Sequence, residues 1–333
     1  MLQQFGNGVS VTGSGSAKLT TQLDNEALSQ VVDTSDEWIA TRTGIRKRHI
    51  AEEGECLRTL AAEAAQGAID LAGLEPGDID LIILATSTPD DLFGSACQVQ
   101  AELGASSAVA FDLTAACSGF VFAMVNAAQF IRTGVYRNVV VIGADLLSRW
   151  TDWTDRRTCV LFGDGAGAVV MQASDRDRLR GFELRSNGSM NSCLNLSYQS
   201  QPKKLVNDVA IQQGTFQPIT MNGREIYKFA VKRVPEVIEK TLFRAELTTD
   251  DIDWLVLHQA NQRILDAVAE RLHIPADRVV SNMAQHGNTS AASIPIALDE
   301  VVRAGKVKGG DTIAVAGFGA GLTWGAAIFE WGK

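Results

Sequence analysis

The cysteine in the stretch TAACSGF, residues 114–120, is a residue whose type and setting could do chemistry. Cys117 stands between an Ala-Ala pair and a Ser-Gly pair, directly before a long apolar helix pattern. Free cysteines are among the most buried residues, so a small core side chain is one interpretation. The other is a nucleophile, because unpaired N–H groups and the dipole at a helix N-terminus favour a thiolate.

A nucleophilic thiol needs a partner, and the chain has four histidines. His49 follows the basic RTGIRKRH and His273 precedes Ile-Pro at a predicted helix end, so we expect both to be solvated. His258, in WLVLHQANQRI, ends a buried strand and begins a polar turn, the usual place of a catalytic side chain in an α/β sheet. A structural histidine is the alternative there. His286 lies in the polar turn QHGNTSAAS beside the amide donor Asn288, where a helix N-cap turn is the alternative.

Two pairs of segments repeat in the same order along the chain, which indicates duplication. LEPGDIDLIILAT at 74–86 matches LTTDDIDWLVLHQ at 247–259, each a loop that leads into a buried strand. Further on, IRTGVYRNVVVIGAD matches VRAGKVKGGDTIAVAGFG, each a helix end followed by a buried strand. Helical patterns lie between the strands in both copies. The pattern predicts two α/β halves with layered sheets, divided into 1–172 and 173–333.

The register of this repeat brings the candidate residues together. The two Asp-Ile-Asp turns align Asp80 with Asp253, and the same offset leads from Cys117 to Ser290 in the GNTSAAS loop. If the halves pack with pseudo-twofold symmetry, these two loops face each other. Cys117, His258 and Asn288 are then expected to converge on one cleft.

Composition excludes several classes of function. The 333 residues are 46% hydrophobic, as in ordinary globular proteins, and the formal net charge of -9 argues against a nucleic-acid binder. The N-terminus lacks the regions of a signal peptide, and there is no apolar run of about 18 residues, so we expect a cytosolic protein without membrane spans. Five cysteines without a C-x-x-C pair indicate neither a disulfide framework nor a zinc site.

Two glycine-rich stretches, GDGAGAVVM and GFGAGLTWGAAIFE, suggest a dinucleotide loop at first sight. Both run into strand-like apolar sequence instead of opening a helix, and neither has the third glycine at the required spacing. We therefore interpret them as strands and expect no nucleotide cofactor of this kind.

The chain resembles the β-ketoacyl-acyl carrier protein synthase III family of the thiolase-fold superfamily over essentially its whole length. The matching stretches are DEWIATRTGIRKRHIA, AACSGF, FGDGAGAVV, MNGREIYKFAV, HQANQRI, HGNTSAASIPIAL and GFGAGLTWG, in the family's order. The resemblance implies a five-layered αβαβα fold built from two duplicated halves, and a cytoplasmic homodimer. It also implies condensation of an acyl-CoA primer, first of all acetyl-CoA, with malonyl-acyl carrier protein to initiate fatty acid biosynthesis. No metal or redox cofactor is required.

The resemblance assigns the reacting groups. The nucleophile falls on Cys117, and the groups that stabilise the enolate fall on His258 and Asn288. Backbone N–H groups of Cys117 and of a glycine-rich turn are suited to an oxyanion hole. This turn is made by Phe318, Gly319, Ala320 and Gly321.

The resemblance also assigns residues to CoA. Trp38 and Arg156 are expected to sandwich the adenine, and Arg42 to approach the phosphates. The segment DWTDRRT departs from the family pattern, with Trp153 where proline is common and Arg157 where glycine is common. The shape of the adenine rim therefore stays open.

The resemblance also assigns the remaining substrate-binding residues. Gly223 and Asn261 are expected to line the pantetheine tunnel. The expected walls of the acyl pocket are Leu147, Phe162 and Met221, with Phe93 closing the pocket of the partner subunit. The segment DLFGSACQ is shorter than in familiar members, so the primer length stays open.

An acidic carrier protein needs a basic face on this acidic chain. Arg224, Lys228 and Lys232 recur four residues apart, so on a helix they form one stripe, extended by Arg233 and Arg263. A solvated helix face is the alternative. A further basic pair of the family reads Glu270-Arg271 here, which predicts a weaker patch. The resemblance places the carrier against Lys228, Gln259, Ala260, Asn261, Gln262 and Arg263.

Two other functions compete with this interpretation. Another thiolase-fold acyltransferase, such as a starter-unit transferase or a head-to-head condensing enzyme, would use the same three residues. A catalytically silent acyl-CoA binding protein belongs to a different class, and it leaves the coincidence of Cys117, His258 and Asn288 unexplained.

Overall fold

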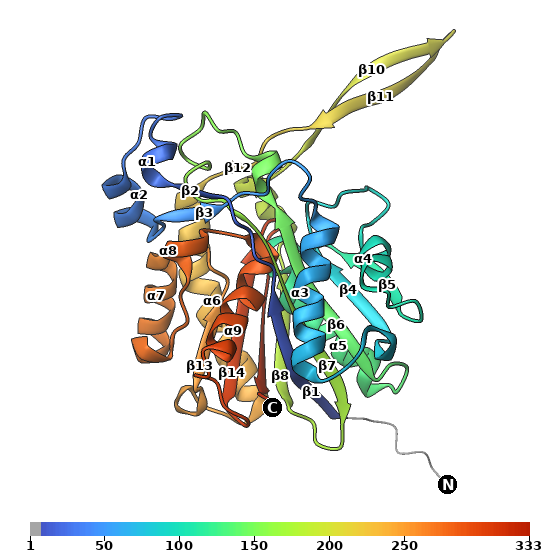
Figure 1. Ribbon diagram of the computed structural model, residues 1–333. Coiled ribbons are helices and arrows are strands. Elements are labelled where there is room, and N and C mark those ends of the chain that lie inside the picture. The colour runs from blue at the N-terminus through green and yellow to red at the C-terminus, as the bar shows by residue number, and fades with distance from the viewer. Residues whose placement is uncertain (1–7) are drawn as a thin grey trace.

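Two stacked mixed sheets organise residues 8–333, the part of the chain that the computed structural model describes (Figure 1). The first sheet has the order β1 (Gly8–Ser16), β7 (Asp164–Ser174), β6 (Asn138–Leu146), β4 (Leu81–Ala85) and β5 (Val109–Leu113). The second has the order β13 (Trp254–Leu257), β14 (Thr312–Gly319), β15 (Thr323–Glu330) and β8 (Leu179–Ser186). Both sheets contain parallel pairs, because β4 pairs with β5 and β6, and β13 pairs with β14.

Helices form three layers around the two sheets. Between the sheets lie α5 (Gly119–Arg132) and α9 (Ser293–Arg303), and each contacts strands of both sheets. On the outer face of the first sheet lie α3 (Leu57–Ala72) and α4 (Ala96–Leu103), while α6 (Gly223–Ala245) covers the second and packs against α7 (Gln262–Leu272). The helix α5 is apolar almost all round, as a helix buried between two sheets must be. The predicted αβαβα layering is confirmed.

Shorter elements complete the fold. A hairpin of β10 (Tyr198–Val206) and β11 (Val209–Phe216) projects from the body (Figure 1). The other short elements are α1 (Asn25–Leu28), α2 (Asp36–Thr43), α8 (Met283–His286), β2 (Gln22–Asp24), β3 (Lys47–His49), β9 (Leu194–Asn195) and β12 (Thr220–Met221). Both glycine-rich stretches lie largely in strands, as predicted, since they contribute to β7, β14 and β15. Within residues 8–333, no helix combines the length and the apolar character that crossing a membrane requires.

The structural repeat follows the sequence repeat with one small shift. The strands β4 and β13 begin at Leu81 and Trp254, which keeps the offset of the Asp-Ile-Asp turns. The helices α5 and α9 begin one position further apart than this offset, and so do the 3₁₀ turns before them, Ala116–Ser118 and Ser290–Ala292. The counterpart of Cys117 is therefore Ala291 and not Ser290. The two turns do contact each other, as predicted. The division of the chain at residue 172 stays a prediction.

Candidate active site

Cys117 lies in the turn Ala116–Ser118, just before α5, and is 8% exposed. The end of β14 passes so close that a Cβ atom on Gly319 would lie 2.5 Å from the Cys117 backbone nitrogen. Real Cβ atoms do not approach a nitrogen so closely, so glycine is required at position 319 for this packing. The Cys117 N–H and the turn after β14 are therefore immediate neighbours.

The thiol of Cys117 is protonated at neutral pH. The pKa of Cys117 is raised to about 12, mainly by burial; the hydroxyl of Ser290 partly offsets this effect, and the negative charge of Asp145 adds to it. That hydroxyl donates to Cys117 Sγ over 3.4 Å. The expectation that the helix end favours a thiolate is therefore not met, because loss of solvation outweighs the helix dipole.

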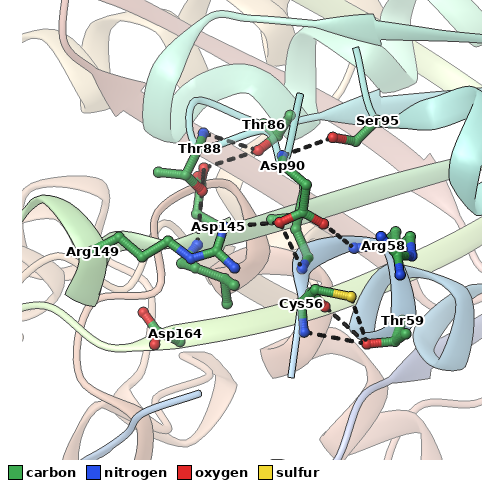
Figure 2. Close-up of polar contacts among 12 residues, drawn as sticks. Cys56, Arg58, Thr59, Thr86, Thr88, Asp90, Ser95, Asp145, Arg149 and Asp164 are labelled. Carbon is green, nitrogen blue, oxygen red and sulfur yellow. Dashed lines mark hydrogen bonds and ion pairs between the residues drawn. The ribbon is translucent and has the colours of Figure 1, made fainter. Parts of the chain in front are cut away.

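Asp145, at the carboxyl end of β6, is a site residue that the sequence reasoning missed. It is fully buried, and one carboxylate oxygen accepts from the hydroxyls of Thr86 and Thr88 at 3.2 and 3.1 Å (Figure 2). The same oxygen accepts from Ser87 N–H at 2.8 Å. The other oxygen accepts from Ala291 N–H at 3.2 Å. Asp145 thus ties the first sheet to the Ser290–Ala292 turn. The available signal was a lone carboxylate at the end of the apolar run VVVIGAD.

His258 directly follows β13 and is buried. Its Nδ1 lies 2.7 Å from Ser293 Oγ, and its ring packs edge-to-face on Phe318 with centroids 5.3 Å apart. Burial lowers the pKa of His258 to about 3, so the imidazole is neutral at physiological pH.

Asn288 precedes the Ser290–Ala292 turn, and its backbone pairs with the segment just before β7. Its backbone donates to Leu161 O at 2.9 Å and accepts from Gly163 N–H at 3.0 Å. Its side-chain Oδ1 accepts from Ser290 N–H at 2.9 Å, which leaves Nδ2 as the donor end of the amide. The backbone pairing and this bond fix both the position and the orientation of the amide.

The three candidate residues line one cavity of about 90 Å³, so their predicted convergence is confirmed as geometry. This cavity also includes the predicted residues Phe162, Met221, Gly223, Asn261 and Phe318. A second, mostly apolar cavity of about 620 Å³ shares Cys117 and Phe162 with the first. Its lining includes the predicted Leu147 and Ala320 and also Leu92, Trp150, Leu194, Leu196, Phe216 and Ile219. The thiol therefore lies where a narrow cavity meets a wide one.

The predicted CoA residues gather on α2 and the segment after β6. The guanidinium of Arg42 lies 4.5 Å from the ring centroid of Trp38, and that of Arg156 lies 5.2 Å from it. An adenine between Trp38 and Arg156 would have to displace Arg156. Arg157, which differs from the family pattern, is exposed and pairs with Asp155 at 2.8 Å instead of contacting the Trp38 ring.

The predicted basic stripe lies on one helix. Arg224, Lys228 and Lys232 are exposed on α6, and the guanidinium of Arg263 lies 5.6 Å from the ring centroid of Tyr227 on the same helix. Lys228 is paired with Glu225 at 2.8 Å, which weakens the local positive field. The predicted residues Ala260, Gln262 and Asn261 are partly exposed, and Asn261 caps α7 by accepting from Arg263 N–H.

The structure contradicts the prediction that Gln259 contacts the carrier protein. Gln259 is fully buried, and its amide donates to Leu257 O at 2.7 Å and Val280 O at 3.2 Å and accepts from Asn282 N–H at 3.2 Å. A side chain with all its amide bonds inside the fold does not contact a carrier protein.

Phe93 does not line either cavity at Cys117. It is fully exposed beside Leu92, on a loop between β4 and α4, and lines a neighbouring cavity of about 530 Å³ that shares Leu92 with the wide one. Asp90 holds this loop by pairing with Arg149 at 2.8 Å and accepting from Arg58 N–H at 3.0 Å (Figure 2). In this chain, then, Phe93 presents an apolar ring to the outside.

Comparison with known proteins identifies the family. Residues 111–188 match the family 3-oxoacyl-[acyl-carrier-protein (ACP)] synthase III, and residues 242–331 match its C-terminal family. The chain is 67% identical over 330 residues to the β-ketoacyl-[acyl-carrier-protein] synthase III of Acaryochloris marina, covering 99% of each chain. It is 68% identical over 326 residues to the enzyme of the same name from a Nostoc species, covering 98% of this chain and 99% of that one. The crystal structure of 3-oxoacyl-[acyl-carrier-protein] synthase III from Aquifex aeolicus matches with a TM-score of 0.90 at 44% identity, covering 97% of this chain and all of that one. The chain belongs to the β-ketoacyl-acyl carrier protein synthase III family.

Proposed function

We propose that the chain performs the decarboxylative Claisen condensation of an acyl-CoA primer with malonyl-acyl carrier protein, with Cys117, His258 and Asn288 as the reacting groups. The observation that carries the proposal is the cavity that these three side chains share, at its junction with a wide apolar cavity. The product is a 3-oxoacyl-carrier thioester, and the reaction initiates fatty acid biosynthesis.

In the first half-reaction the sulfur of Cys117 attacks the acyl carbonyl of the CoA thioester. The carbonyl oxygen becomes negative and is stabilised by the Cys117 N–H and by the N–H groups of the turn 318–321. The C–S bond to CoA breaks, and the CoA sulfur takes the proton of the thiol. This proton transfer is needed because the pKa of the buried thiol is raised to about 12.

In the second half-reaction malonyl-carrier loses CO₂, and its thioester oxygen becomes an enolate. Neutral N–H donors of His258 and Asn288 suit this oxygen, because they stabilise a developing negative charge without a competing positive one. The carbanion attacks the acyl-Cys117 carbonyl, the bond to sulfur breaks, and the thiolate takes up a proton from water. All bonds and protons balance without a metal or a redox cofactor.

The surrounding residues supply the substrate path. Trp38 and Arg156 take the adenine, and Arg42 reaches the phosphates. The two cavities that meet at Cys117 take the rest of the substrate, with Gly223 and Asn261 along the pantetheine and with Leu147, Phe162 and Met221 around the acyl group. The basic stripe on α6 with Arg263 receives the acidic carrier.

A homodimer completes this proposal. The edge strand β5 exposes Val109 and Phe111, and the neighbouring loop exposes Leu92 and Phe93. An exposed apolar edge strand favours pairing with a second chain, and twofold symmetry then brings Phe93 to the partner. A cytoplasmic location fits the five unpaired thiols, since a reducing compartment keeps cysteines free.

The test separates the two half-reactions. The chain is incubated with acetyl-CoA, and peptide mass spectrometry should find acetyl on Cys117. Malonyl-carrier is then added, and CO₂ and 3-oxobutyryl-carrier should form in equal amounts. An acyl-Cys117 that releases no CO₂ would point to another thiolase-fold acyltransferase, and no acylation at all would point to a silent binder. His258→Ala should still take acetyl on Cys117 but release little CO₂, and replacement of the exposed His273 by alanine is its matched control.

A further inference from the structure

The first residue of α9, Ser293, is a buried hydroxyl in contact with His258. We propose that Ser293 is a positioning residue that fixes the tautomer of His258, so that Nε2 carries the proton and donates into the cavity. The inference rests on the proposed function, since it concerns the donor that holds the enolate.

The direction of the hydrogen bond follows from a neighbouring one. The backbone N–H of Gln259 lies 3.2 Å from Ser293 Oγ, and a backbone N–H can only donate. The serine oxygen therefore accepts from Gln259. Among the described residues, Ser293 Oγ makes only these two hydrogen bonds, so His258 Nδ1, at 2.7 Å, is the acceptor that remains for the proton of this buried hydroxyl. A neutral imidazole whose Nδ1 accepts has its own proton on Nε2.

This chain of contacts is rigidly held. The side chain of Gln259 bonds to Leu257 O and Val280 O, which fixes the backbone that carries the donating N–H. Ser293 itself begins α9, which contacts both β7 and β13. The buried Gln259 therefore acts two steps away from the reaction, through Ser293 and His258.

The turn Ser290–Ala292, directly before α9, orients the second enolate donor, Asn288. Ser290 N–H donates to Asn288 Oδ1 at 2.9 Å, so that Nδ2 is left for substrate. Two serines of this segment, Ser290 and Ser293, thus set the direction of both enolate donors before substrate enters. Preorganised donors need no reorientation during the reaction, which is the basis of electrostatic stabilisation in such sites.

The opposite tautomer predicts different chemistry. With a proton on Nδ1 donated to Ser293, Nε2 would present a lone pair to the cavity. A lone pair repels an enolate oxygen and suits a base that takes the proton of Cys117. The two tautomers therefore assign His258 to different half-reactions.

The first experiment reads the tautomer directly. The full chain is labelled with ¹⁵N-histidine, and its four histidines give few enough signals to assign His258 by comparison with a His258→Gln variant. We expect the signal of an unprotonated nitrogen at Nδ1 and of a protonated one at Nε2 in the wild type. Ser293→Ala should shift both signals toward an average of the two tautomers. A proton on Nδ1 in the wild type would overturn the proposal.

The second experiment measures the half-reactions separately. In Ser293→Ala, transfer of acetyl to Cys117 should stay within about twofold, while decarboxylation of malonyl-carrier should fall about ten- to a hundredfold, as expected when a buried acceptor loses its partner. Ser293→Thr keeps the hydroxyl and should recover most of the decarboxylation. Thr241→Val removes a different buried hydroxyl, one that bonds only within α6, and should change neither rate.

Equal losses in both half-reactions, with an unchanged ¹⁵N pattern in Ser293→Ala, would assign Ser293 to the fold alone and overturn the proposal. Failure of the proposed function is seen separately, because the wild type would then release no CO₂ from malonyl-carrier whatever its tautomer. The wild-type spectrum decides the tautomer even if a Ser293 variant fails to fold.

Discussion

The two turns that precede α5 and α9 have the same backbone and different chemistry. Each begins with a residue of positive φ, Ala116 at 47° and Ser290 at 52°, and each lies against a central strand of the opposite half. A Cβ atom on Gly143 of β6 would lie 2.2 Å from Ala291 O, and one on Gly317 of β14 would lie 3.3 Å from Cys117 O. The repeated geometry lets one turn carry the nucleophile while the other orients the donors.

Burial acts in opposite directions on the two turns. At the first turn the reacting group must become an anion, and burial opposes this by raising the pKa of Cys117. The donors next to the second turn must stay neutral, and burial favours this for His258, which follows β13, by lowering its pKa. The same buried cavity therefore favours decarboxylation, whereas acylation depends on the CoA sulfur of the substrate to take the proton of the thiol.

The largest effect is expected at the first turn. Cys117→Ala should abolish both acyl transfer and condensation, by more than about a thousandfold, since no other residue of this turn can form the thioester. Peptide mass spectrometry after incubation with acetyl-CoA measures this. Cys97→Ala, which removes an exposed thiol, is the control and should be acylated normally. Condensation that survives in Cys117→Ala would contradict the assignment.

At the second turn the loss should be confined to one half-reaction. Asn288→Ala should still accept acetyl from acetyl-CoA, while decarboxylation of malonyl-carrier falls about a hundred- to a thousandfold, as for loss of one oxyanion donor. Single-turnover rates of the two steps test this. Asn126→Ala, an exposed amide on α5, is the control. Equal losses in both steps would mean that Asn288 supports the fold through its pairing with Leu161 and Gly163.

Much of this comparison was readable in the sequence. The repeat located both turns and indicated their contact, because helix ends and buried strands leave regular patterns of glycine and apolar residues. The sequence did not predict that the offset between the two halves increases by one position from the strands to the helices. The offset between the Asp-Ile-Asp turns therefore identified Ser290 as the counterpart of Cys117 instead of Ala291. Shifts of this size depend on how the two halves pack.

The sequence could not reveal the buried polar contacts. In the sequence, Asp145 and Ser293 are single polar residues beside apolar runs. Their roles follow from hydrogen bonds to residues distant in the chain, Ala291 for Asp145 and His258 for Ser293. The family resemblance placed Gln259 among the residues that contact the carrier, and tertiary packing instead buries it. The state of the thiol was likewise beyond sequence patterns, since its pKa depends on total burial.

The neutrality of His258 predicts a pH dependence of stability. Its pKa is about 3 in the folded chain and about 6.5 in the unfolded one, so between these values only the unfolded chain binds the proton. The free energy of unfolding should therefore be unaffected by this group above pH 6.5 and decrease below it, by roughly 1.4 kcal/mol per pH unit. Urea titrations of wild type and His258→Gln from about pH 6.5 down to about pH 4.5 measure the difference in slope. Parallel slopes would show that His258 is not buried as a neutral group.

The smallest effect concerns the exposed basic stripe, which differs from both turns in being solvated. Charges at the rim of an interface mainly steer the encounter and are screened by salt, so Arg263→Glu should raise the KM for malonyl-carrier several-fold and flatten its salt dependence. Acylation by acetyl-CoA should stay nearly intact. Lys306→Glu changes the net charge equally but precedes β14, whereas the site lies beyond the end of that strand, so it should leave the KM unchanged. If Arg263→Glu slowed both half-reactions together, Arg263 would belong to the CoA path or the fold. The carrier would then have to dock on another face, and the division between a buried reacting site and a solvated docking stripe would fail.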